Sequence, residues 1–183
     1  MSEVSERYRK VAAQFTERVD AVPADAWDDP APCDGWVARD VVGHLAEWLP
    51  GFFFDTWGLA AAPIPSTDDD PVGAWNVVNG TIQSALDDPD VATSRRDSPM
   101  GPQTFEQAID MICTPDVLVH TWDLARATGL DESLDAVEVH RFVESMEPMD
   151  QMLRESGHYG PRVAVAAEAD EQTRLIAFLG RQP

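Results

Sequence analysis

The chain has 183 residues, of which 44% are hydrophobic and 25% are charged, a composition typical of one globular domain. Asp and Glu number 33 against 13 Lys and Arg, which gives a net charge of −20 and a pI near 4.2. Such a charge repels nucleic-acid phosphates and anionic lipid surfaces. We therefore expect no nucleic-acid or membrane partner.

Targeting and redox features of the sequence favour the cytoplasm. The first ten residues, MSEVSERYRK, have neither the apolar core nor the cleavage site of a signal peptide. The longest apolar candidate, residues 48–64, is shorter than the roughly 20 residues of a membrane span and contains Pro50 and Pro63. Cys33 and Cys113 are too few for a disulfide framework. We expect a cytoplasmic protein with reduced thiols.

Helical periodicity dominates the N-terminal half. A first helix, capped by Ser2 or Ser5, is predicted from apolar residues three and four positions apart: Val4, Tyr8, Val11, Phe15, Val19 and Val22. A second helix is predicted from near Val37, with a kink at Pro50. Its apolar stripe comprises Val41, Leu45, Trp48, Leu49 and Phe52.

Two further helices and two loops follow. Residues 60–70 are predicted as a loop and residues 71–86 as the third helix, with Pro71 at its first position. The polar segment 87–102 is predicted as another loop. The fourth helix spans about 105–127 and ends before Gly129. Pro115 lies inside it, and we favour one kinked helix over a new helix capped by Thr114, because the apolar pattern continues through the proline.

The C-terminal part is predicted to carry a helix over about 134–146 and another over about 170–179, with an extended piece possible at 162–169. No alternating pattern is strong enough to indicate a sheet. The sequence thus predicts an all-α fold in one domain: a four-helix bundle over about 1–128 and a helical extension over about 129–183.

The best candidates for chemistry are three residues on the predicted buried faces. Asp116 and His120 are one helical turn apart and extend the stripe that begins at Phe105, while His44 lies beside the stripe of the second helix. A buried carboxylate and imidazole need partners, and with a second His they form a two-His, one-carboxylate metal site. The alternative is an ion pair between Asp116 and His120, with His44 as a core residue.

Other polar residues are weaker candidates. Asp40 and Glu47 could orient His44, and Asp123 could orient His120, although helix capping and solvation also explain such residues. Cys33 is either a packed core residue or a thiol near the site. His140 and His158 have no partner at a helical spacing.

Two motifs carry a family resemblance. The segment CDGWVARDVVGHL at 33–45 resembles the C-x-G-W-x-x-x-D-x-x-x-H signature of DinB-like proteins, in particular the metal-binding domain of mycothiol-dependent maleylpyruvate isomerase. The segment VHTWDLARATG at 119–129 is similar to the second family signature, H-x-W-D-L-A-x-A-x-G. The ending RLIAFLGR at 174–181 also resembles the close of short, single-domain relatives.

The resemblance implies a DinB-like four-helix bundle that holds a divalent metal, usually zinc or nickel, through His, an acidic residue and His. His44 matches the first ligand and His120 the last. The acidic ligand, usually Glu, is here Asp116. Because Asp is one methylene shorter, its carboxylate must come closer or bind through water.

Three functions agree with this pattern. The first is an enzyme that uses a metal and a small thiol such as mycothiol, either a cis–trans isomerase or an S-transferase acting on an electrophile. For a dianionic substrate, Arg126 and Arg39 are the candidate cations. The second is a non-catalytic bundle that binds a metal or small ligand, and the third is a relative with a degenerate metal site. The isomerases carry a further C-terminal domain for which this length leaves no room, so the substrate stays open. An exposed bundle face is compatible with a homodimer.

Overall fold

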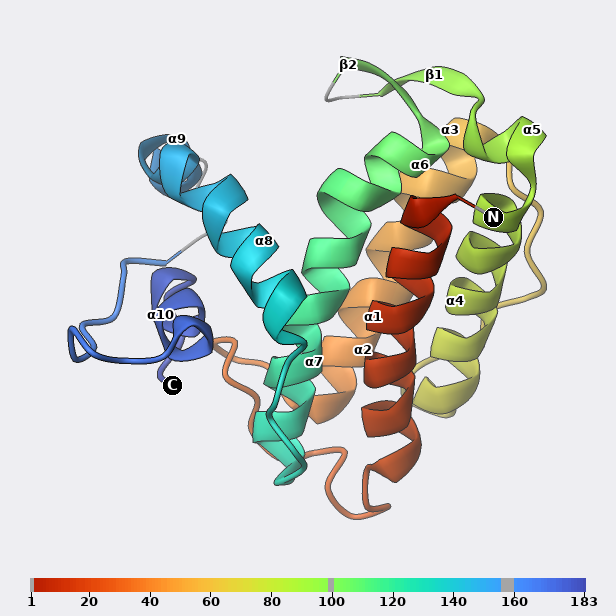
Figure 1. Ribbon diagram of the computed structural model, residues 1–183. Coiled ribbons are helices and arrows are strands. Elements are labelled where there is room, and N and C mark those ends of the chain that lie inside the picture. The colour runs from red at the N-terminus through yellow and green to blue at the C-terminus, as the bar shows by residue number, and fades with distance from the viewer. Residues whose placement is uncertain (1, 99–100, 156–159) are drawn as a thin grey trace.

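In the computed structural model, which describes residues 2–98, 101–155 and 160–183, four helices form a bundle in which the first and fourth run in one direction and the second and third in the other (Figure 1). Its helices are α1 (Glu3–Ala21), α2 (Ala38–Leu49), α4 (Pro71–Asp87) and α7 (Thr114–Thr128). Each packs on two others: α1 on α4 and α7, and α2 on the same pair. The predicted all-α, four-helix bundle is confirmed.

The apolar stripes explain this packing. Tyr8, Val11, Phe15 and Val19 of α1 are buried, and Phe15 makes an edge-on contact with Trp75 of α4 at 4.7 Å between ring centroids. Ser2, rather than Ser5, caps α1, because its hydroxyl accepts the Ser5 N–H. The indole of Trp75 donates to Thr16 Oγ1 at 2.8 Å, so the one polar atom of this large core residue is paired.

Pro50 begins one π-helical turn, and Pro115 follows another. A π-helical turn, Pro50–Phe54, joins α2 to the short α3 (Asp55–Trp57), and another, Ile109–Cys113, joins α6 (Phe105–Ala108) to α7. The chain is therefore helical from 105 to 128 through Pro115, and Gly129 ends α7 in the left-handed conformation at φ 69°. One helix through Pro115 is thus observed, with the irregularity placed before the proline.

The predicted loop at 87–102 is wrong in part. It contains α5 (Pro89–Ala92), which Asp88 caps, and β1 (Arg95–Ser98), which pairs antiparallel with β2 (Gly101–Thr104). Three of the four β1 side chains are exposed, and the buried side chain of β2, Gln103, is polar. Without buried apolar side chains there is no apolar alternation, so the pattern that predicts strands is missing.

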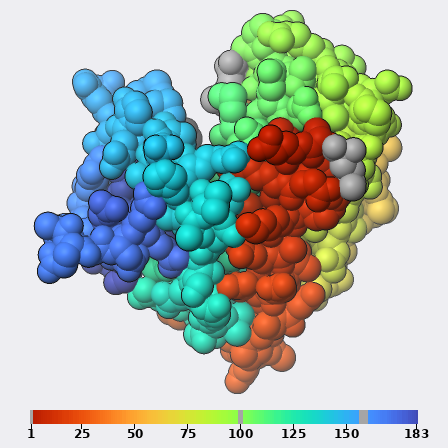
Figure 2. Space-filling view, in the orientation of Figure 1, coloured from red at the N-terminus to blue at the C-terminus, as the bar shows by residue number. Residues whose placement is uncertain are grey.

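The C-terminal extension packs against one side of the bundle. It comprises α8 (Ala136–Met146), a 3₁₀ turn (Glu147–Met149), α9 (Asp150–Glu155) and α10 (Glu171–Phe178). Buried side chains of α8 and α10 join the same apolar cluster as the bundle. Figure 2 shows an indentation between the α8–α9 arm and the end of the bundle that carries α6.

Two smaller expectations concern this extension. Residues 162–169 form no strand, although the Val163 N–H bonds to the Ala177 carbonyl. His140 does have acidic partners, since its ring nitrogens lie 2.9 Å from Glu171 and 3.6 Å from Glu144, whereas His158 lies outside the described residues. Within the described ranges, every helix is too short or too polar to cross a membrane.

Candidate metal centre

His44 projects from the middle of α2 toward α7. Asp40, one turn earlier, accepts the Val37 N–H at 2.8 Å and so fixes the start of the helix. The imidazole packs beside the rings of Trp36 and Trp48, with centroids 5.2 and 6.0 Å away. Its side chain keeps 32% of its surface exposed, so it is reachable from solvent.

Asp116 and His120 face His44 from α7. Oδ2 of Asp116 lies 3.5 Å from Nε2 of His44, and Oδ1 lies 3.5 Å from Nε2 of His120. The indole of Trp48 donates to Oδ2 at 3.0 Å. Despite its shorter side chain, Asp116 therefore reaches both imidazoles directly.

The geometry of these three side chains suits a metal ion. Their donor atoms all lie within 4.8 Å of one another. Ligands at 2.0–2.1 Å from a tetrahedral zinc lie roughly 3.3 Å apart, close to the two carboxylate–imidazole distances. Two imidazoles and one carboxylate leave at least one coordination position open for water or substrate.

A second carboxylate lies behind His120. Asp123 is 0% exposed, and its Oδ2 is 2.9 Å from Nδ1 of His120. The two atoms are in ion-pair contact and not in an aligned hydrogen bond, and a carboxylate at one imidazole nitrogen favours metal binding at the other. This places Nε2 of His120 on the side of Asp116 and His44.

Arg181, near the C-terminal end of the chain, completes the arrangement. Its Nε and Nη2 donate to the two oxygens of Asp123, each at 2.7 Å. Nη2 also lies 3.5 Å from Sγ of Cys33, which is 3.6 Å from Asp123. Cys33 is therefore beside the site, as one of the two sequence hypotheses holds.

The charged side chains of the centre shift one another's pKa values. Burial alone would raise the pKa of Asp116, but His120 and His44 outweigh it and lower that pKa. Burial would lower the pKa of His120, whereas Asp116 and Asp123 raise it to about 9. Burial would also raise the pKa of Asp123, but its contacts with His120 and Arg181 keep it low. Both carboxylates are ionised, and in the metal-free protein His120 is the cation between them.

A second group of donors, Cys33, His120 and Asp123, is also compact. The guanidinium of Arg181 already provides a cation there, because it contacts both Cys33 and Asp123. Burial, together with the nearby Asp123 charge, raises the pKa of Cys33 to about 12, which disfavours the thiolate that a metal requires. The chemistry of the donors therefore favours His44, Asp116 and His120.

The structure separates the other candidates from this centre. No hydrogen bond or ion pair of the described residues joins Asp40 or Glu47 to His44; both line a depression of about 640 Å³ beside it. Arg126 pairs with Glu132 at 2.8 Å and stacks on Trp122. Arg39 pairs with Asp28. These two arginines thus have acidic or aromatic partners of their own.

Sequence reasoning missed Arg181, Trp36 and Trp48 as parts of the site. Trp36 belongs to the first family signature and Arg181 to the terminal one, but no spacing indicates that they meet. Only the folded chain brings Arg181 to Asp123, 58 positions away. The four-residue spacing between His44 and Trp48 could have indicated that the Trp48 indole lies at the site.

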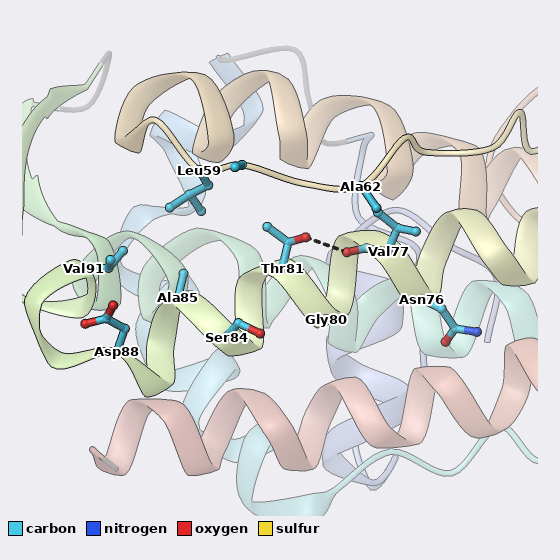
Figure 3. Close-up of a pocket in the computed structure, with 11 residues that line it drawn as sticks. Leu59, Ala62, Asn76, Val77, Gly80, Thr81, Ser84, Ala85, Asp88 and Val91 are labelled. Atoms are coloured by element: carbon cyan, nitrogen blue, oxygen red, sulfur yellow. Dashed lines mark hydrogen bonds between the residues drawn. The ribbon is translucent and has the colours of Figure 1, made fainter.

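A second depression lies on the outer side of α4 (Figure 3). Its volume is about 510 Å³, and its walls come from α4 and the segment that follows α3, including Leu59, Val77, Gly80 and Thr81. Asp88 is its one ionisable lining residue. It offers no ligand set and shares no residue with the depression beside His44.

Two imidazoles and a carboxylate thus face one another between α2 and α7 of a helical bundle. Residues 8–72 match the family described as the mycothiol maleylpyruvate isomerase N-terminal domain, which confirms the resemblance carried by the motif at 33–45. This matched segment includes His44 and ends before Asp116 and His120.

The whole-chain relatives are uncharacterized. Two proteins of Mycobacterium tuberculosis, from strains CDC 1551 / Oshkosh and H37Rv, are each 27% identical over 178 residues, which is 95% of this chain and 95% of each relative. No solved structure matches the chain.

Proposed function

We propose that the chain binds one divalent cation, zinc or nickel, between α2 and α7, with His44, Asp116 and His120 as ligands. The observation that carries this proposal is the compact donor set, whose atoms lie within 4.8 Å of one another. The 2.9 Å contact of Asp123 with the far nitrogen of His120 supports it, because such a contact orients a ligating imidazole.

We further propose that the chain catalyses a reaction that uses a small thiol such as mycothiol. A bound zinc or nickel ion supplies a Lewis acid that lowers the pKa of a coordinated thiol and polarises a carbonyl. The thiol sulfur would then add to an electrophilic carbon. If it leaves again after rotation about the former double bond, the net result is isomerisation; if it stays and the thiol proton passes to the product, the result is S-transfer.

The protein's own side chains define where such a reaction would occur. His44 is open to the depression beside α2, whereas His120 is held from behind by Asp123. Trp36 lines this depression, and its ring contacts His44 at a tilt and stacks on His120, with centroids 5.2 and 6.0 Å away. A substrate would enter from the side of His44 and contact Trp36 on its way to the ligands.

A second candidate function is metal binding without turnover, and the charge of the depression favours it. Asp40, Glu47 and Asp68 line the wall, and among its described lining residues there is no Lys or Arg. A dicarboxylate substrate would be repelled there. If the chain is an enzyme, its electrophile is therefore neutral or cationic.

Elemental mass spectrometry of protein purified without a metal-affinity tag tests the metal site. We expect about one equivalent of zinc or nickel in the wild type, lost in His44→Ala, Asp116→Asn and His120→Ala. His140→Ala, which removes an exposed imidazole on α8, is the matched control and should keep the metal. His44→Ala is the most informative variant, because its partly exposed side chain is the least needed for folding. A metal-free wild type after reconstitution would reject the proposal.

Turnover separates the two functions. The metal-loaded wild type and His44→Ala would be incubated with mycothiol and neutral or dianionic unsaturated carbonyl compounds, and products followed by mass spectrometry. Thiol-dependent conversion by the wild type alone supports the enzyme. Metal binding without conversion of any compound supports the non-catalytic bundle.

A further inference from the structure

The C-terminal segment reaches the candidate metal centre through one side chain. Arg181 donates to both oxygens of Asp123 at 2.7 Å, and Asp123 lies 2.9 Å from Nδ1 of His120. Asp123 is completely buried, and the side chain of Arg181 that covers it is 17% exposed. The three residues form a continuous line from the tail to the proposed ligand.

The position of Arg181 depends on the whole extension. Its N–H bonds to the carbonyl of Ile176 after a turn at Gly180, where φ is 86°. This turn directly follows α10, which packs on α8. Gln172 of α10 also accepts the Leu134 N–H and donates to the Glu132 carbonyl, which ties α10 to the segment after α7. Docking of α10 therefore places the guanidinium.

We propose that Arg181 is a positioning residue of the metal centre: through Asp123 it holds the ring of His120 so that Nε2 faces Asp116 and His44. This inference rests on the proposed metal site. It adds that the C-terminal extension, which contributes no ligand, is required for tight metal binding.

Loss of the Arg181 charge and loss of its positioning role should change the affinity for zinc in opposite directions, so an experiment can distinguish them. Removing a positive charge near a cation site strengthens cation binding if electrostatics alone acts. Loss of an oriented residue behind a ligand weakens metal binding, typically by roughly 10–100-fold. A merely structural ion pair that anchors the tail predicts no weakening.

The experiment is a competition titration of zinc against a chromophoric chelator, with the full-length chain. We expect roughly 10–100-fold weaker binding in Arg181→Ala and an intermediate loss in Arg181→Lys, because Lys contacts one carboxylate oxygen where Arg contacts two. Arg126→Ala, which removes the same charge from a residue paired with Glu132, is the control and should bind zinc as tightly as the wild type or slightly more tightly.

A double-mutant cycle tests the route through Asp123. If Arg181 acts only through Asp123, the Asp123→Asn/Arg181→Ala protein should bind zinc no more weakly than Asp123→Asn alone. In zinc-loaded protein, the Nδ1–H resonance of His120, observed with ¹⁵N-labelled histidine, should shift in Arg181→Ala and stay unchanged in Arg126→Ala. Circular dichroism checks folding, and Arg181→Lys serves if Arg181→Ala does not fold.

The outcomes separate the two proposals. A wild type that binds no zinc rejects the metal site itself. A wild type that binds zinc, together with Arg181 variants of equal or tighter affinity, rejects the positioning role alone. Additive losses in the double variant also overturn it, since they would show that Arg181 acts independently of Asp123.

Discussion

At the scale of single residues, the candidate centre depends on neighbours that fix each donor from outside. Asp116 accepts the indole N–H of Trp48, and His120 has Asp123 at its far nitrogen. His44 contacts Asp116 and the rings of Trp36, Trp48 and His120. Among the three candidate ligands, His120 is thus the enclosed one, whereas His44 and Asp116 keep 32% and 28% of their side-chain surface exposed.

Cys33 should be an unreactive thiol, although it lies beside the site. Burial and Asp123 raise its pKa from 9.0 to about 12, so the thiolate is scarce below pH 10. Because only the thiolate reacts, alkylation by iodoacetamide at pH 8 should be about 1000-fold slower than for an unperturbed cysteine. Intact-mass spectrometry after timed labelling measures this rate.

Unfolded protein is the reference sample for the labelling experiment. Protein unfolded in guanidinium should be modified at both Cys33 and Cys113, because neither is then buried. Rapid modification of folded protein at Cys33 alone would contradict the assignment of a protonated, half-buried thiol.

At the scale of elements, a side chain of α1 provides a hydrogen bond near Pro115, the proline in the fourth bundle helix. Pro115 has no N–H, and the carbonyl of Asp110, five residues earlier in the π-helical turn, instead accepts a hydrogen bond from Arg7 of α1 at 3.1 Å. Arg7 also pairs with Glu138 of α8 at 2.6 Å. One buried guanidinium therefore joins α1, the irregular turn before Asp116, and the C-terminal extension.

Replacing Arg7 should destabilise the fold strongly. Its side chain and that of Glu138 are 9% and 6% exposed, so Arg7→Met leaves a buried carboxylate without its cation. We expect a loss of about 3–5 kcal/mol in the free energy of unfolding, measured by urea denaturation.

Arg9, two residues along α1, provides the comparison. Its guanidinium pairs with Glu6 and Asp87 at the surface, and such exposed pairs contribute about 0–1 kcal/mol. Arg9→Ala should therefore lower the free energy of unfolding by less than about 1 kcal/mol. Equal losses in the two variants would show that the Arg7 network is not the buried junction described above.

At the scale of the whole molecule, the net charge of −20 destabilises the folded state. Like charges repel across a compact protein, and salt screens this repulsion within about 10 Å at 0.1 M. The buried ion pairs are screened much less. Folding should therefore become more favourable as ionic strength increases.

The melting temperature should accordingly rise between 0.01 M and 0.3 M sodium chloride. Calorimetry or circular dichroism at pH 7 measures it, with a chelator present so that bound metal does not contribute. A falling melting temperature would mean that surface ion pairs, rather than net repulsion, dominate the electrostatic free energy of this fold.

The sequence by itself determined the parts of this protein that follow from local periodicity. The stripes Tyr8–Val19 and Trp75–Leu86 predicted two bundle helices correctly, since burial of one helical face repeats every three or four residues. The same spacing placed Asp116 and His120 on one inward face, and the motifs at 33–45 and 119–129 indicated the family, for which residues 8–72 provide the match. The ligand roles of His44, Asp116 and His120 remain predictions.

Only the tertiary structure decided what depends on contacts between distant segments. Strands β1 and β2 bury no apolar side chain and therefore left no periodic signal. The sequence offered two readings of Cys33, and folding places it beside Asp123 and Arg181. Arg181 reaches Asp123 because α10 docks on α8, and no rule of spacing along one helix can express a contact across 58 residues.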